Sequence, residues 1–374
     1  MAVTGRLSCA AALFLQISLA TASPPAAGHD KITMAARYIG SAGCSSSSCH
    51  GAAGERHNQY LVWSQHDFHA RASLILTNAR SMQMAQSLGL ASASSDARCT
   101  VCHSPLSAIS PGRIAHAEQR DNGVSCESCH GPAESWLRSH TRRDYTYAMR
   151  VSSGLRDLRN LYVRANACVA CHQVLEPEVA TAGHPSLFFE LATQLASEPP
   201  HWRDTGDSSM QTWLTGQAVA LRELSWSATR DRTTGAAEQA VALSWLLAMV
   251  TRANPSLPSI TERADPAQTQ KSADELARRA AVRRFASEDT SKLVRLLSSA
   301  VMDMHVSLSA HDMLYYRAKR IALALLALLP ANESSYASEL RQLTTDVKSL
   351  AGFDWTAFVQ HMQAFRVKFD AEHR

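Results

Sequence analysis

The sequence predicts a mainly α-helical protein in two parts, with little regular β structure in either. Residues 23–204 hold eight of the nine cysteines and have few long apolar runs. Residues 205–374 have no cysteine and repeat apolar residues at three- and four-residue spacing, which is typical of amphipathic helices. We therefore expect a cysteine- and histidine-rich domain followed by an antiparallel helical bundle.

Six stretches of the second part predict helices. They are separated by breaks at Asn254-Pro255, Pro258, Pro330 and Gly352, which are typical helix ends. The charged segment 253–275 is expected to be a flexible connection. The predicted helices are Ser208–Arg230, Ala236–Arg252, Asp289–Asp303, Asp312–Leu329, Glu333–Leu350 and Asp354–Asp370.

Four cysteine pairs of the first part are each followed directly by a histidine. Three motifs read C-x-x-C-H and end at His103, His130 and His172, and a looser one, with four serines between its cysteines, ends at His50. In a c-type haem two thiols bond the porphyrin as thioethers and the adjacent histidine ligates the iron. Chance predicts roughly 0.01 strict motifs in such a chain. The motifs therefore predict a multihaem cytochrome c with four covalently attached haems, held by Cys44, Cys49, Cys99, Cys102, Cys126, Cys129, Cys168 and Cys171.

Structural zinc is the alternative for these cysteines. Cys99, Cys102, Cys126 and Cys129 could form a four-thiolate site. Zinc does not require a histidine directly after each second cysteine, however, and here this arrangement occurs four times. The first motif, taken alone, could also be a polar loop. Its place at the head of a series favours a haem site.

The N-terminus resembles an export signal. A mostly apolar run over 7–20 precedes Ala20-Thr21-Ala22, a small-residue cleavage pattern, and the run is too short for a membrane span. An uncleaved anchor is the alternative. We expect a signal peptide over 1–22, cleaved after Ala22, and a periplasmic protein without stable membrane insertion. A linker over 23–40, a tetrahaem cytochrome c domain over 41–204 and a helical domain over 205–374 would follow.

The sixth ligand of each iron decides what the iron can do. A second imidazole saturates it for electron transfer, whereas a vacant position can bind small molecules. Three histidines are the main distal candidates. His69 opens a helix-like stretch, His140 ends a helix predicted from Gly131-Pro132, and His184 precedes a helix predicted over Ser186–Ser197. Weaker candidates are His57, His66, His116 and His201, while Met82 and Met84 are expected to be packing residues.

Arginine dominates the positive charge of the first part. Residues 23–204 contain 15 arginines and one lysine. Guanidinium groups pair with carboxylates in a bidentate manner, so they suit the haem propionates. A solvated basic face is the alternative. Nothing in the charge pattern supports nucleic-acid binding. The densest arginine cluster is Arg138, Arg142, Arg143, Arg150, Arg156, Arg159 and Arg164.

Three strings carry a family resemblance. Tyr38-Ile-Gly-Ser-Ala-Gly-Cys44, the stretch 123–137 and Ala182-Gly-His-Pro-Ser-Leu-Phe-Phe-Glu190 resemble the cytochrome c-552/554 family, which is related to the haem core of hydroxylamine oxidoreductase. The resemblance covers roughly 36–204. It implies a helical chain around closely stacked haem pairs, with mostly bis-histidine iron.

The resemblance also concerns individual residues. It implies that His69, His140 and His184 serve as distal ligands, and that the second haem in sequence, on His103, has an open iron. The chain departs from the family in its longer first motif. It also lacks a further haem motif that some relatives carry in the C-terminal half.

Three classes of function follow. The leading one is a carrier that passes electrons between a donor and an acceptor redox protein through mostly bis-histidine haems. The second is a haem enzyme that acts on a small nitrogen or sulfur oxide, or on peroxide, at an open iron. The third is a non-catalytic interaction module. No acid/base group besides histidine accompanies the motifs, so the sequence favours the carrier and indicates no catalytic side chain.

Overall fold

The protein is mainly helical and has no β-sheet in the part that the structure describes. The computed structural model describes residues 35–117, 122–203, 205–230, 235–304, 311–329 and 334–373. Tyr38 and Ile114 form an isolated parallel bridge. The expected signal peptide with its cleavage point, and most of the expected linker, lie outside the described residues. None of the described helices has the length and apolar character needed to cross a membrane.

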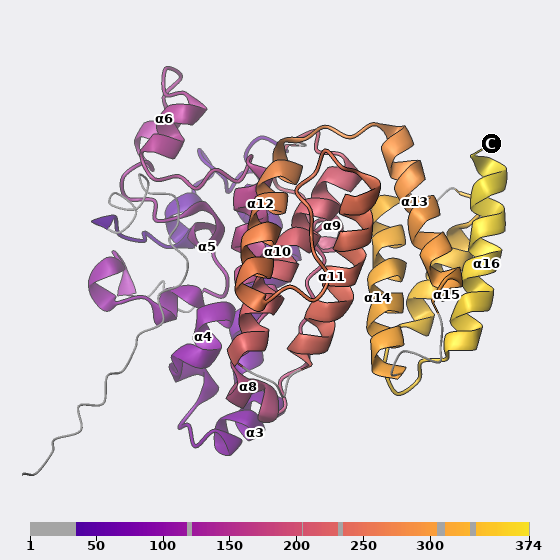
Figure 1. Ribbon diagram of the computed structural model, residues 1–374. Coiled ribbons are helices and arrows are strands. Elements are labelled where there is room, and N and C mark those ends of the chain that lie inside the picture. Colours follow the sequence, from indigo (N-terminus) through magenta and orange to yellow (C-terminus); the bar gives the residue numbers. More distant parts are fainter. Residues whose placement is uncertain are drawn as a thin grey trace, which may run out of the picture.

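The first part of the chain is built from short helices joined by turns, drawn in indigo and magenta in Figure 1. Side chains cap several of them: Asn78 accepts from Ser81 N, and Asp96 accepts from Arg98 N. Short helices fit a region with few apolar runs. They are η1 Ser41–Cys44, α2 Gln59–His66, η2 Phe68–Thr77, α3 Ala79–Ser87, η3 Ala93–Ser95, α4 Ala97–His103, η4 Pro105–Ala108, η5 Pro111–Arg113, α5 Cys126–His130, η7 Ser139–Thr141, α6 Tyr147–Ser152, α7 Leu161–His172, α8 Pro177–Thr181 and α9 Leu191–Ser197.

The second part consists of longer helices, and the prediction of helices there is confirmed. In Figure 1, α10, α11 and α12 lie beside the first part, and α13 to α16 lie beyond them. The helices are α10 Ser209–Arg230, α11 Ala236–Ala253, α12 Pro266–Val282, α13 Ser287–Met302, α14 His311–Leu328, α15 Ala337–Asp346 and α16 Trp355–Glu372.

The prediction of a flexible connection over 253–275 is wrong. Residues from Pro266 onward form α12, which starts with Asp265 as its cap and packs against α10. Its buried face consists mainly of small residues, including Ala273, Ala277 and Ala280. The charged residues of this segment suggested a solvated connection. Its alanines instead favour a helix, because alanine has the highest helix propensity.

Two further predicted helices differ from the structure: the helix expected from Gly131 to His140 does not form, and the one expected over Ser186–Ser197 is shorter. Gly131, with φ of 81°, ends α5, and Arg156 N donates to His130 O, so the chain reaches His140 through turns and η7. Helix α9 begins at Leu191 rather than at Ser186. Residues 184–190 have no regular structure. Before His140 the backbone bonds are isolated turns, such as Leu137 N to Ala133 O and His140 N to Trp136 O, rather than a continuous helical ladder.

One buried apolar cluster joins the two parts. It includes Leu161, Ala165 and Val169 of α7, and it continues through α10 to the C-terminal helices. Helix α9 also approaches α10 closely at Gly216, where an added Cβ would lie 2.6 Å from Leu191 Cβ. The core therefore continues across the expected boundary between residues 204 and 205.

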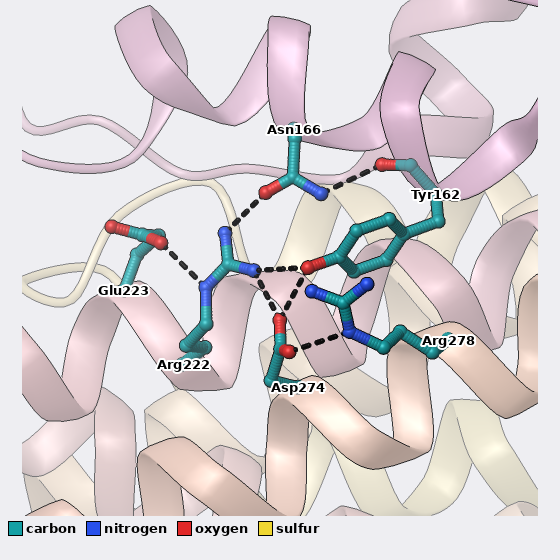
Figure 2. Close-up of polar contacts among 6 residues, drawn as sticks. All are labelled: Tyr162, Asn166, Arg222, Glu223, Asp274 and Arg278. Atoms are coloured by element: carbon teal, nitrogen blue, oxygen red, sulfur yellow. Dashed lines mark hydrogen bonds and ion pairs between the residues drawn. The ribbon is translucent and has the colours of Figure 1, made fainter. Parts of the chain in front are cut away.

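A polar network reinforces this contact between the two parts (Figure 2). The Asp274 carboxylate accepts from Tyr162 Oη at 2.6 Å, Arg222 Nη1 at 2.6 Å and Arg278 Nε at 2.8 Å. Arg222 also donates to the side chain of Asn166. Tyr162 and Asn166 belong to α7, so the network connects the helix of the fourth motif to α10 and α12.

Candidate haem sites

The histidine of each strict motif ends a short helix. Helices α4, α5 and α7 end at His103, His130 and His172, so each cysteine pair lies on one or two turns before its histidine. None of the eight motif cysteines forms a disulfide. All eight thiols therefore remain available for thioether bonds.

The first motif is a tight turn rather than a helix. Cys44 ends η1, and Cys49 N and Gly51 N both donate to Ser46 O. Any Cβ at position 51 would clash with the carbonyl of Ser45, so the turn requires glycine there. The four serines thus form a compact loop that keeps Cys44, Cys49 and His50 in one segment.

The four motifs are neighbours in space, although not in chain order. The Cys44 and Cys126 thiols are close neighbours, which brings the first motif next to the third. Cys102 and Cys171 join the second to the fourth in the same way. The third and fourth motifs approach each other at Cys129 and Cys168, where burial raises the thiol pKa values to about 11 and about 12. The motifs therefore follow one another in the order first, third, fourth, second.

This arrangement separates the thiols that a zinc site would need. Cys126 is paired with Cys44, and Cys102 with Cys171. Within the described ranges, the group of three or more possible metal-binding side chains is Asp67, His69 and Glu198, which contains no cysteine. The geometry disfavours a four-thiolate zinc site.

Three motif histidines each face one of the three distal candidates. The ring centres are 6.1 Å apart for His50 and His140, and their planes differ by 16°. Two imidazoles that share one metal ion, each through a bond of about 2 Å, have ring centres roughly 6 Å apart. The spacing therefore fits one iron between the rings of each pair. The other two pairs are His69 with His172 at 6.1 Å and His103 with His184 at 6.2 Å.

Hydrogen bonds hold these rings in orientation. His50 Nδ1 bonds to Gln59 Oε1 at 2.8 Å, and His184 Nδ1 bonds to Pro185 O at 2.8 Å. His140 Nδ1 bonds to Leu137 O. With Nδ1 engaged, Nε2 is the nitrogen left for a metal, which is the usual arrangement of metal-binding histidines.

His69 has a carboxylate as its orienting partner. Its Nδ1 lies 3.1 Å from Asp67 Oδ1, and its backbone N–H donates to the same oxygen at 2.9 Å. The hydrogen bond to Asp67 raises the pKa of His69, although burial opposes this. Asp67 was not predicted from the sequence, although it lies two residues before a candidate ligand, at a helix start.

His130 differs from the other three motif histidines. In the described part of the chain, no histidine ring lies about 6 Å from its ring. Burial lowers the pKa of His130 to about 4, and the positive charges of His201 and Arg156 add to this effect. The resemblance implied an open iron at His103, but the structure instead brings His184 next to His103.

The weaker candidates are placed elsewhere. His57 bonds through Nδ1 to Cys49 O at 2.7 Å, and His201 bonds through Nδ1 to Pro199 O at 3.3 Å. His66 ends α2, and His116 is exposed. Met84 is buried, as expected of a packing residue, whereas Met82 is 60% exposed and does not fit that expectation.

Most of the clustered arginines contact protein groups. Arg142 pairs with Asp144, and Arg164 pairs with Asp207. Arg156 Nη1 donates to Ser128 O at 2.7 Å and to Cys129 O at 3.0 Å, so it fixes the backbone of the third motif. These contacts give part of the cluster a structural role that the sequence did not indicate.

The third motif contains a second side chain that the sequence analysis missed. Glu127 is 2% exposed, and its carboxylate accepts from Ile39 N at 3.0 Å, Gly40 N at 2.7 Å and Ala133 N at 2.6 Å. Burial raises the pKa of Glu127, although these bonds oppose the shift. Glu127 thereby joins the segment before the first motif to the third motif.

Comparison with known proteins supports the resemblance. Residues 41–131, which hold the first three motifs, match the family model of cytochrome c554 and c-prime. The chain therefore carries a domain of the cytochrome c554 family, which implies covalently bound c-type haem. No curated protein and no solved structure gives a significant match.

Proposed function

We propose that this protein is a periplasmic tetrahaem cytochrome that passes electrons between a donor and an acceptor protein. The haems supply reversible one-electron chemistry when they are bound. The cytochrome c554 family match over 41–131 is consistent with electron transfer. The export signal expected from the sequence supports the compartment.

The observation that carries this proposal is the contiguity of the four attachment motifs. The neighbouring thiols Cys44 and Cys126, Cys129 and Cys168, and Cys171 and Cys102 form one continuous series. Cysteines this close together would hold neighbouring haems near one another, so that an electron could pass between them. The first and second motifs would then be the two ends at which protein partners exchange electrons.

The paired rings support an assignment of axial ligands to three irons. His50 with His140, His172 with His69, and His103 with His184 would each saturate one iron and exclude other ligands. His130 has no facing imidazole among the described residues, so we place the open position there rather than at His103. Three saturated sites out of four agree with a carrier.

Mass spectrometry and electron paramagnetic resonance test these assignments. The mature chain should carry four haems after denaturation, and Cys49→Ala should lose one haem only. The ferric protein should show mainly low-spin signals, with a high-spin component near one iron per chain. His140→Ala should convert one further haem to high spin while all four stay attached. A chain with three haems would remove the first motif from the set.

A haem enzyme acting on a small nitrogen or sulfur oxide is the second candidate, and the surroundings of His130 favour it. His130 is half-buried, and its electrostatic neighbours include His201. Glu198 lies near Cys129 and is also close to His201, so a carboxyl and an imidazole stand beside this motif. Nitric oxide and cyanide should bind the open iron. Turnover of hydroxylamine or nitrite there would establish the enzyme, whereas an entirely low-spin protein that binds neither ligand would exclude it.

A further inference from the structure

The segment that carries His184 has little local structure of its own. Residues 184–190 connect α8 to α9 without helix or strand. On one side His184 borders a cavity of about 270 Å³, which is also lined by Leu224, Ser227 and Gln239 of α10 and α11. The imidazole therefore has free space next to it. Its backbone is held on the α8 side, where His184 N donates to Val179 O at 3.2 Å and Arg80 Nη2 donates to Gly183 O at 2.7 Å. On the other side the chain continues into residues 185–190.

Contacts from the haem-free helices hold the other end of this segment. Arg320 of α14 is 2% exposed, and its Nη1 lies 3.4 Å from Phe189 O and 3.1 Å from Gln217 Oε1. Its guanidinium carbon lies 3.9 Å from the centre of the Phe188 ring, and Lys319 Nζ lies 4.6 Å from the same centre. Two cations thus pack against one aromatic ring, four residues after His184.

Gln217 extends this contact to the start of α9. Its Nε2 lies 3.3 Å from Glu190 Oε1, and the Glu190 carboxylate accepts from Thr193 N at 2.7 Å as the cap of α9. Residues 188, 189 and 190 are therefore each engaged by a side chain of α10 or α14. No comparable set of contacts holds the neighbouring residues 185 and 186 within the described chain.

Arg320 occupies an energetically unfavourable position. Burial lowers its pKa to about 9, and its Nη2 has no partner among the described residues. A buried cation without a direct ion pair costs stability compared with an apolar side chain of similar size. A residue of this kind is better explained by what it positions than by the stability it adds.

We propose that Arg320, with Lys319 and Gln217, positions His184 on the iron held by His103, so that the haem-free helical half controls one axial ligand. The inference rests on the proposed function, because it takes His184 to be a distal ligand. Without this contact, segment 184–190 loosens and the imidazole moves into the adjoining cavity. Arg320 is a positioning residue and does not itself touch the metal site.

The test compares three variants of the full-length, haem-loaded protein by electron paramagnetic resonance. His184→Ala defines the full effect, a gain of about one high-spin iron per chain. Arg320→Met should give a substantial fraction of the same gain, with four haems still attached and with new nitric oxide binding. Arg320→Lys should lie between Arg320→Met and the wild type.

Arg222→Met is the matched control. Arg222 is also a largely buried arginine of the helical half, but it contacts α7, whose His172 is held next to two thioether-forming cysteines. This variant should lower the melting temperature and leave the spin state unchanged. A loss of stability without a spin-state change in Arg320→Met would assign Arg320 a structural role only and overturn the inference.

Two further variants distinguish a failure of the inference about Arg320 from a failure of the ligand assignment of His184. If Arg320→Met does not fold, Phe188→Leu removes the ring that both cations contact and should raise the high-spin fraction in the same way. An unchanged spectrum for Phe188→Leu, beside a changed one for His184→Ala, contradicts the inference. An unchanged spectrum for His184→Ala instead contradicts the ligand assignment in the proposed function. Added imidazole should restore the low-spin signal of His184→Ala.

Discussion

At the scale of single residues, Asp67 is expected to influence the reduction potential of one haem through its hydrogen bond with His69. Burial alone would raise the pKa of Asp67, but hydrogen bonds from His69 lower it overall, so the group is a carboxylate at neutral pH. A carboxylate that accepts the Nδ1 proton makes an imidazole a stronger donor to its metal. Stronger donation favours the ferric state and lowers the reduction potential.

Asp67→Asn should therefore raise the reduction potential of one haem, by roughly tens of millivolts. Potentiometric titration followed by visible absorbance measures this shift. Asp346→Asn is a suitable control, because Asp346 Oδ2 bonds to His361 Nδ1 at 2.7 Å in the haem-free half. Equal potentials in both variants and the wild type would show that Asp67 does not act through His69.

At the scale of elements, the approach of the third motif to η2 depends on one glycine. Gly123 has φ of 62°, and a Cβ there would lie 2.5 Å from His69 O and 2.7 Å from Ala70 O. The neighbouring Val124 N donates to His69 O at 2.8 Å. This close backbone contact places the segment of His69 beside α5, so the element that carries a distal candidate depends on a residue without a side chain.

Gly123→Ala should destabilise the holoprotein by about 1–3 kcal/mol, since it combines an unfavourable φ with a backbone clash. Gly89→Ala isolates the first effect, because Gly89 has φ of 67° and nothing within 4 Å of the added Cβ. Thermal unfolding should rank wild type, Gly89→Ala and Gly123→Ala in order of decreasing stability. Equal losses in the two variants would mean that the close approach contributes nothing.

At the scale of the whole molecule, Asp274 links the two parts of the chain and makes their contact sensitive to acid. Burial alone would raise its pKa, but hydrogen bonds from Tyr162, Arg278 and Arg222 lower it overall. A carboxyl whose pKa is lower in the folded state stabilises the protein above its unfolded pKa of about 4. This stabilisation is lost as the pH falls through the folded pKa.

The free energy of unfolding should therefore decrease below about pH 4, and Asp274→Asn should weaken this dependence. Urea unfolding between about pH 3 and pH 7 measures both effects. At neutral pH the variant should be less stable than the wild type, because Arg222 and Arg278 lose the carboxylate that they share. Parallel pH profiles for the two proteins would contradict the role assigned to Asp274.

The shared core leads to a separate prediction for the isolated fragment 205–374. We expect circular dichroism to show a helical spectrum without visible absorbance, because the fragment has no cysteine. We also expect it to be less stable than in the whole protein, since α10 loses its contacts with α7 and α9. A fragment as stable as the full chain would show that the two parts fold independently.

The sequence alone determined the features that depend on short-range spacing. Two thiols and an imidazole must reach one porphyrin, so the attachment residues lie within a few positions of one another. Helices such as α10 and α14 were likewise readable, because amphipathic spacing is a local property. Helix α12 was missed, since its buried face is built mainly from alanine rather than from large apolar residues.

Only the tertiary structure decided which histidine faces which motif. His69 and His172 are far apart in the chain, and their approach depends on Gly123, α7 and the shared core. Long-range packing also determines three other features. These are the order of the motifs, the isolation of His130 and the contact of Arg320 with segment 184–190. Such contacts leave no periodic signal, because each is made once, between segments that the fold brings together.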